Sequence, residues 1–113
     1  MNYREHLSEP WFTEISEGRK TIEGRKNKGR FATMKIGETI EWYNEDRCCY
    51  SRITNVRHYA TFESYLLEEG LSKCLPMIES IEEGVNVYYQ YYTKEDEETY
   101  GVVAIEIEMI SNE

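Results

Sequence analysis

The sequence predicts one α+β domain whose β-sheet curls toward a barrel and is flanked by short helices. Strand patterns occur in the first 60 residues and return at residues 101–110, whereas residues 61–92 have helical spacing and capping signals. The last strand must therefore pair with an early one, which bends the sheet. A length of 113 residues, without a linker or an internal repeat, predicts a single domain over residues 1–113.

The N-terminal quarter predicts a short helix followed by a strand. Ser8 is a capping residue, Pro10 suits a first helical turn, and Gly18 can take the left-handed conformation that ends a helix. The β-branched pair at Thr21 starts a strand that runs through residue 25. We expect residues 26–30 to form a turn, residues 31–35 a short extended piece, and residues 36–38 another turn.

The middle of the chain predicts a hairpin. Residues 39–43 alternate and place Ile40 and Trp42 on one face, which predicts that Trp42 is buried. After a turn at residues 44–46, residues 48–59 form a long strand whose period slips, so a β-bulge is expected.

The second half predicts three helical pieces and the closing strand. Thr61 caps a helix that ends at Gly70, and a short piece covers residues 71–75. Ser80 caps a third helix that reaches Tyr92, with Glu83 at the capping-box position. The charged residues 93–99 read as a turn before the strand at 101–110.

Charge is distributed unevenly along the chain. The net charge is −9, yet residues 1–60 sum to +2 and residues 61–113 to −11. Within the first half, basic residues are concentrated in residues 19–35. Such a basic patch can hold one phosphate or nucleotide, or it is a solvated loop whose charge balances the acidic half. Extended binding of duplex DNA is disfavoured. The patch comprises seven basic residues: Arg19, Lys20, Arg25, Lys26, Lys28, Arg30 and Lys35.

Several protein classes are excluded or disfavoured by composition. The longest uncharged stretch has 10 residues, whereas a membrane helix needs about 20 apolar residues. The first residues are charged rather than apolar, so no export signal is visible and a cytoplasmic protein is expected. His6 and His58 lack metal-ligand spacing, and the cysteines form no C-x-x-C pair, so neither a metal nor a cofactor is expected. The cysteines are Cys48, Cys49 and Cys74.

Residues 18–25 concentrate the chemistry of the chain. On a strand, Glu23 and Arg25 project to the same face, and Lys20 can swing to meet them. In such a cluster Lys20 is a candidate base or nucleophile, Glu23 a proton carrier, and Arg25 a group that binds a phosphate or an oxyanion. The alternative is a salt bridge on a solvated strand, which contributes little stability.

The spacing G-x-K-x-x-E-x-R, present as Gly18, Lys20, Glu23 and Arg25, resembles the signature of the ASCH domain family in the PUA-like superfamily. The order of the surrounding elements is similar over nearly the whole chain. The resemblance implies a small PUA-like β-barrel flanked by helices, with the motif lining a cleft that receives RNA or a nucleotide-like ligand.

One branch of the family, the small N4-acetylcytidine amidohydrolases, relies on the motif lysine, a threonine and a distal glutamate. Lys20 matches the lysine, but Glu23 stands where that branch has its threonine. The distal carboxylate is either Glu68 or Glu69. The departure at Glu23 weakens this activity and leaves the broader family resemblance intact.

Aromatic residues near the motif are candidates for the walls of the cleft. Trp11 lies close to the motif in sequence, and a tyrosine run follows at helical spacing. That run either packs in the core or stacks on bases, with Tyr89 or Tyr92 offering a hydroxyl at the cleft edge. The resemblance, together with these residues, implies a module that binds RNA or a modified nucleoside or nucleotide, and the alternative is an amidohydrolase or ribonuclease. The predicted ligand contacts are Lys20, Glu23, Arg25, Trp11 and Lys26.

Overall fold

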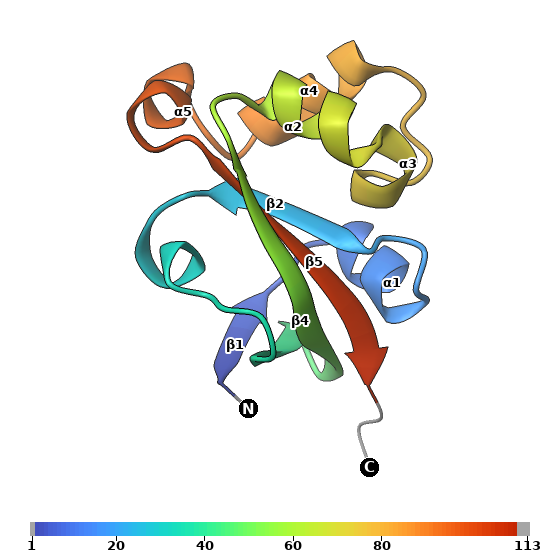
Figure 1. The fold of residues 1–113 in the computed structure, drawn as a ribbon. Coiled ribbons are helices and arrows are strands. Elements are labelled where there is room, and N and C mark those ends of the chain that lie inside the picture. Colours follow the sequence, from blue (N-terminus) through green and yellow to red (C-terminus); the bar gives the residue numbers. More distant parts are fainter. Residues whose placement is uncertain (1, 111–113) are drawn as a thin grey trace.

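The computed structural model describes residues 2–110. Their five strands form one sheet that curls into a half-barrel (Figure 1). The strand order is β1-β3-β4-β5-β2. The closing strand pairs antiparallel with the early strand β2, so the predicted α+β class and the curled sheet are confirmed. The strands are β1 (Tyr3–His6), β2 (Ile22–Lys26), β3 (Thr39–Asn44), β4 (Arg47–Tyr59) and β5 (Val102–Ile110).

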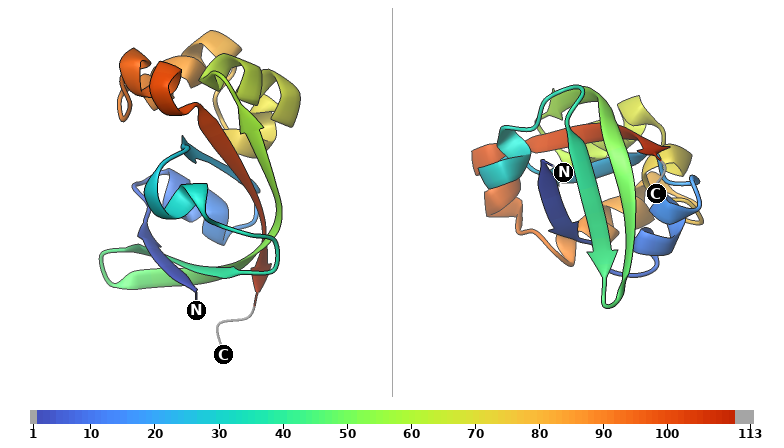
Figure 2. Two further views of the ribbon diagram at one scale, coloured as in Figure 1. Left: turned by 60° about the vertical axis from the view of Figure 1, so that its left-hand side comes forward. Right: turned by 90° about the horizontal axis from the view of Figure 1, so that it is seen from below.

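Four of the helices, α2 to α5, gather at one end of the sheet, and α1 lies lower against it (Figures 1 and 2). The predicted caps Thr61 and Ser80 are confirmed, because their side chains accept from the backbone N–H groups of Ser64 and Glu83. The helices are α1 (Trp11–Ser16), α2 (Phe62–Glu69), α3 (Leu71–Cys74), α4 (Ile81–Tyr89) and α5 (Lys94–Tyr100), with a 3₁₀ turn, η1, at Gly29–Ala32.

The core lies between the concave face of the sheet and the helices. Trp42 is completely buried, as its alternation with Ile40 predicted, and its indole N–H donates to Ser51 Oγ at 2.9 Å. The expected bulge in β4 occurs between Ile53 and Asn55. No helix within residues 2–110 is long and apolar enough to cross a membrane.

Two elements differ from the sequence prediction. Strand β1 was not expected, because its residues are mostly charged. It pairs in parallel with β3, and its Arg4 forms an ion pair with Glu41. The predicted charged turn at residues 93–99 is wrong, since α5 forms there. Thr93 caps this helix and three acidic residues occupy its first turn, where they complement the helix dipole.

The connection after β2 also differs. The sequence predicted a turn from residue 26, but Lys26 is the last residue of β2, and η1 replaces the extended piece expected after residue 30. Phe31 and Met34 explain this, because both are buried and draw the segment onto the core. The N-cap residue of α1 is Pro10 rather than Ser8. Gly18 takes the left-handed conformation (φ +80°) that was predicted for the end of this helix.

The half-barrel has two edge strands, β1 and β2, which approach one another without pairing. Side chains bridge the gap between them. The Arg25 guanidinium donates to the carbonyl oxygen of His6 at 3.1 Å, and Arg30 of η1 forms an ion pair with Glu5 at 2.7 Å. The predicted site residues therefore lie at the opening of the half-barrel.

Candidate functional site

A pocket of about 280 Å³ lies beside the edge of β2, between the segment that joins β1 to α1 and the end of α4. Four separate parts of the chain meet there, and they bring together four of the five predicted ligand contacts. The pocket is lined by His6, Leu7, Ser8, Trp11, Lys20, Glu23, Gly24, Arg25, Leu75, Val87, Tyr88, Tyr91 and Tyr92.

Lys20 is buried, with 1% of its surface exposed, at the corner where α1 passes into β2. Its ammonium donates to the carbonyl oxygen of Ile22 at 2.8 Å and to the carbonyl oxygen of Cys74. Its Nζ also lies 3.1 Å from Glu23 Oε1. An ammonium has three N–H donors, so the protein satisfies all of them.

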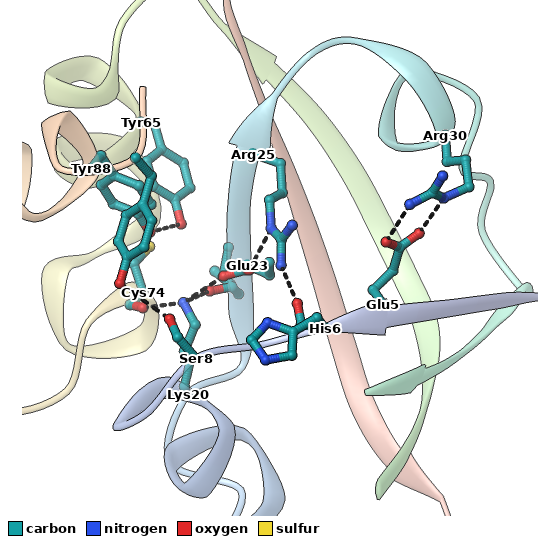
Figure 3. Close-up of polar contacts among 12 residues, drawn as sticks. Glu5, His6, Ser8, Lys20, Glu23, Arg25, Arg30, Tyr65, Cys74 and Tyr88 are labelled. Atoms are coloured by element: carbon teal, nitrogen blue, oxygen red, sulfur yellow. Dashed lines mark hydrogen bonds and ion pairs between the residues drawn. The ribbon is translucent and has the colours of Figure 1, made fainter. Parts of the chain in front are cut away.

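Glu23 lies between two cations (Figure 3). Its Oε1 faces Lys20, and its Oε2 accepts from Arg25 Nε at 2.7 Å. Burial by itself would raise the pKa of Glu23, but the positive charges of Lys20 and Arg25 outweigh it and hold the pKa below its usual value. We name Lys20, Glu23 and Arg25 the buried triad. Its formal charge is +1, and the alternative of a solvated salt bridge is wrong.

Arg25 is the member of the buried triad that keeps hydrogen-bonding capacity. Of its five N–H groups, one donates to Glu23 and one to the carbonyl oxygen of His6. Its guanidinium carbon lies 4.5 Å from the centre of the Phe31 ring, and the side chain is 20% exposed. Arg25 therefore offers positive charge and free donors to a ligand in the pocket.

Gly24, between two members of the buried triad, is required by packing. A Cβ at this position would lie 2.5 Å from Cζ of Tyr65, which is too close for any side chain. The Tyr65 hydroxyl lies 3.0 Å from that of Tyr88, so the ring is held from both sides. The sequence analysis did not assign this role to Gly24, although a glycine inside a strand signals a close approach.

Four aromatic residues, Trp11, Tyr88, Tyr91 and Tyr92, line the pocket together with the buried triad. Trp11 and Tyr88 are buried, Tyr92 is half-buried, and Tyr91 is 54% exposed at the rim. The Tyr91 hydroxyl lies 3.1 Å from Ser8 Oγ, across the pocket mouth. Of the two tyrosines predicted at the cleft edge, Tyr92 lines the pocket, whereas the Tyr89 hydroxyl donates to Glu97.

Three predicted residues lie elsewhere. Lys26 does not line the pocket, because its side chain turns to Asp96, 3.4 Å away. Glu69 is buried in a pair with Arg57, and Glu68 is exposed, so neither lines the pocket. Conversely, the lining residues of the segment after β1 were missed, because β1 itself gave no strand signal.

The basic run does not form a patch of free charges. Arg19 pairs with Glu14, Lys26 with Asp96 and Arg30 with Glu5, while Lys20 and Arg25 share Glu23. Five of the seven basic residues are therefore paired with four carboxylates, which leaves one positive charge, that of the buried triad. Among residues 2–110, no group of three or more histidine, cysteine or acidic side chains is arranged to hold a metal ion.

Two solved structures are similar to this chain over nearly its whole length. The chain is 39% identical to hypothetical protein PH0355, whose crystal structure aligns over 97% of this chain and all of that one with a TM-score of 0.90. Protein PF0455 from Pyrococcus furiosus, solved by NMR, is 37% identical over 98% of this chain and 99% of that one, with a TM-score of 0.82.

A mutant of ZmASCH from Zymomonas mobilis shares the fold alone, at 12% identity and a TM-score of 0.64, over 95% of this chain and 68% of that one. No curated protein sequence matches the chain. The family model for the ASCH domain matches residues 6–111, which include the whole of the pocket lining. The chain belongs to the ASCH domain family.

Proposed function

We propose that the chain binds RNA, or a modified nucleoside or nucleotide, by holding one base in this pocket. The observation that carries the proposal is that one pocket combines aromatic lining residues with a buried, singly positive triad. Small-molecule pockets typically measure about 300–1,000 Å³. At about 280 Å³ this pocket lies just below that range, so it suits a ligand no larger than one nucleoside, and any longer RNA lies outside it.

The aromatic lining of the pocket supports stacking. Each base stacked on an aromatic side chain contributes about 1–3 kcal/mol to binding. Tyr91 is the ring best placed for this, because it lines the pocket and is already more than half exposed. Trp11 and Tyr88 are fixed by burial and shape the floor.

The charge of the site supports a ligand rich in oxygen acceptors. Lys20 and Glu23 satisfy one another and the surrounding backbone, so Arg25 is the group left to bind. A guanidinium grips a phosphate or a pair of carbonyl oxygens through two parallel N–H bonds. Lys26, paired with Asp96 outside the pocket, stays a prediction as a phosphate contact.

Hydrolysis is the less supported function. As a base or nucleophile Lys20 needs a free lone pair, but its ammonium donates to three acceptors. The lowered pKa of Glu23 makes this carboxylate a weak base. Product assays on acylated cytidines and short RNAs should therefore show no turnover with the wild type. Turnover that Glu23→Gln slows by about 10²-fold or more would establish the hydrolase instead.

Binding is tested with Tyr91→Ala. Loss of one stacked ring should weaken nucleoside or single-stranded RNA binding by about 5- to 150-fold, which corresponds to about 1–3 kcal/mol. The fold should persist, because Tyr91 is exposed. Tyr50→Ala, which removes a tyrosine of β4 outside the pocket, is the matched control and should bind like the wild type. Equal affinity in all three proteins would contradict the proposal.

A further inference from the structure

Strand β2 leaves one edge unpaired, and the register of its pairing shows which backbone groups point there. The backbone N–H of Ile107 donates to the oxygen of Thr21 at 3.0 Å, and that of Asn27 to the oxygen of Gly101 at 3.1 Å. In an antiparallel ladder the bonded residues alternate. The odd-numbered residues of β2 therefore bond to β5, and the backbone groups of Ile22, Gly24 and Lys26 face the open edge.

The protein itself covers this edge on both sides of Gly24. The carbonyl oxygen of Ile22 accepts from Lys20 Nζ at 2.8 Å. On the other side, the Tyr92 ring lies beside Lys26, with the Lys26 Nζ 5.9 Å from the ring centre. Between them Gly24 lines the pocket, and within residues 2–110 neither its N–H nor its C=O has a hydrogen-bond partner. A donor and an acceptor thus stand side by side at the pocket wall.

Resting on the proposed function, we propose that Gly24 reads the base through its backbone and selects a uracil-type imide, an N–H flanked by two carbonyl groups. Gly24 presents its N–H and its C=O at the open edge, and the guanidinium of the next residue in the chain, Arg25, lines the same pocket. Taken in chain order, these groups are donor, acceptor, donor. The imide edge of uracil presents acceptor, donor, acceptor, which complements it at each place.

Other bases match this order less well. Cytosine places an unprotonated ring nitrogen at the centre of its edge, so that nitrogen would face the carbonyl oxygen of Gly24 without a proton between them. Adenine has no second acceptor on this edge for Arg25. A site whose polar groups are left unpaired by the wrong ligand discriminates strongly against it.

The backbone of Gly24 is held in place for this role. The Tyr65 ring packs directly on the glycine, and the hydrogen bond between Tyr65 and Tyr88 keeps the ring there. An open strand edge can bind a partner through its unpaired main-chain N–H and C=O groups. Arg25, bonded to Glu23 and His6, is the side chain that completes the pattern.

The test changes the ligand, because any substitution of Gly24 displaces Tyr65. Uridine, 5-methyluridine, N3-methyluridine and cytidine are titrated into the full chain by calorimetry. Uridine and 5-methyluridine should bind with similar affinity, because the methyl group at C5 lies off the imide edge. N3-methyluridine and cytidine should each bind at least about 10-fold more weakly, since both lose the donor to the Gly24 carbonyl.

Repeating the series with Arg25→Lys and Tyr91→Ala separates this inference from the proposed function. Arg25→Lys should narrow the preference for uridine over cytidine, since an ammonium lacks the planar fork. Suppose that nucleosides bind, that Tyr91→Ala weakens the binding of all of them, and that N3-methylation does not change the affinity. The inference about the imide is then overturned, and the proposed function of the pocket stands. If no nucleoside binds at all, both are overturned.

Discussion

Lys20 shows at the scale of one residue how burial changes the meaning of a motif. The sequence placed a lysine, a glutamate and an arginine at strand spacing, and the structure brings the three together as predicted. Because the ammonium donates to two carbonyl oxygens and one carboxylate, Lys20 ties β2 to the end of α3. Its role in the geometry is to position the neighbouring groups.

Lys20→Met should therefore destabilise the protein. The substitution leaves Glu23 with one cation and two buried carbonyl groups without a donor, which costs about 3–5 kcal/mol. Chemical denaturation measures this change. Lys35→Met, at an exposed position, is the control and should change stability by less than about 0.5 kcal/mol. A loss below 1 kcal/mol at Lys20 would contradict the structural role.

Glu23 gives the buried triad a pH dependence. Its pKa in the folded protein lies below the ordinary 4.5, so its ionised form adds stability that is fully present above pH 4.5. That stability is lost as the pH falls through the folded pKa. The difference in unfolding free energy between wild type and Glu23→Gln should thus shrink as the pH is lowered from 6 to about 3, as measured by urea titrations. A constant difference would show that Glu23 is not ionised.

At the scale of elements, the sequence predicted strands and helices where local patterns are strong. The alternation at Ile40 and Trp42 and the caps at Thr61 and Ser80 were confirmed. Strand β1 was missed because it owes its conformation to pairing with β3 rather than to its own charged residues. Helix α5 was missed because its mostly charged residues show no apolar periodicity, although Thr93 and the acidic first turn stabilise it locally.

The candidate site was predictable to the same extent. The motif residues and Trp11 could be predicted as site residues from the sequence, because they all lie within residues 11–25. The wall from α4 joins them only through tertiary packing. A glycine inside a strand signals a close approach, but the partner of Gly24 is a tyrosine 41 positions away, which no local pattern identifies.

Gly24→Ala tests the packing between β2 and α2. The added Cβ would lie 2.5 Å from the Tyr65 ring, so the ring or the strand must move. We expect a loss of about 1–3 kcal/mol in thermal or chemical unfolding, as for other overpacked cores. Combining it with Tyr65→Leu should cost less than the sum of the two single changes, because the clash is removed. Strict additivity would contradict the contact.

The whole molecule is acidic, and the pairing of its basic residues disfavours nonspecific binding of anions at the site. The net charge is −9, and most of the basic run is paired with carboxylates. Binding of RNA should consequently involve about one phosphate, giving a log–log salt slope near −0.7 on a single strand. Titrations between 50 and 200 mM salt measure this slope. A value of −2 or steeper would show that the ion pairs open to bind several phosphates.

The central claim, that one nucleoside-like unit occupies the pocket beside β2, is tested most directly by an NMR titration with uridine and a short single-stranded RNA. The account predicts that the NMR signals of the Gly24 backbone amide, the Trp11 indole N–H and the Tyr91 backbone amide all shift when ligand is added. The signal of the Gly37 amide, in an open turn away from the pocket, should not shift. Shifts confined to the acidic helix α5, which does not line the pocket, or none at ligand concentrations that saturate other nucleoside-binding proteins, would contradict it.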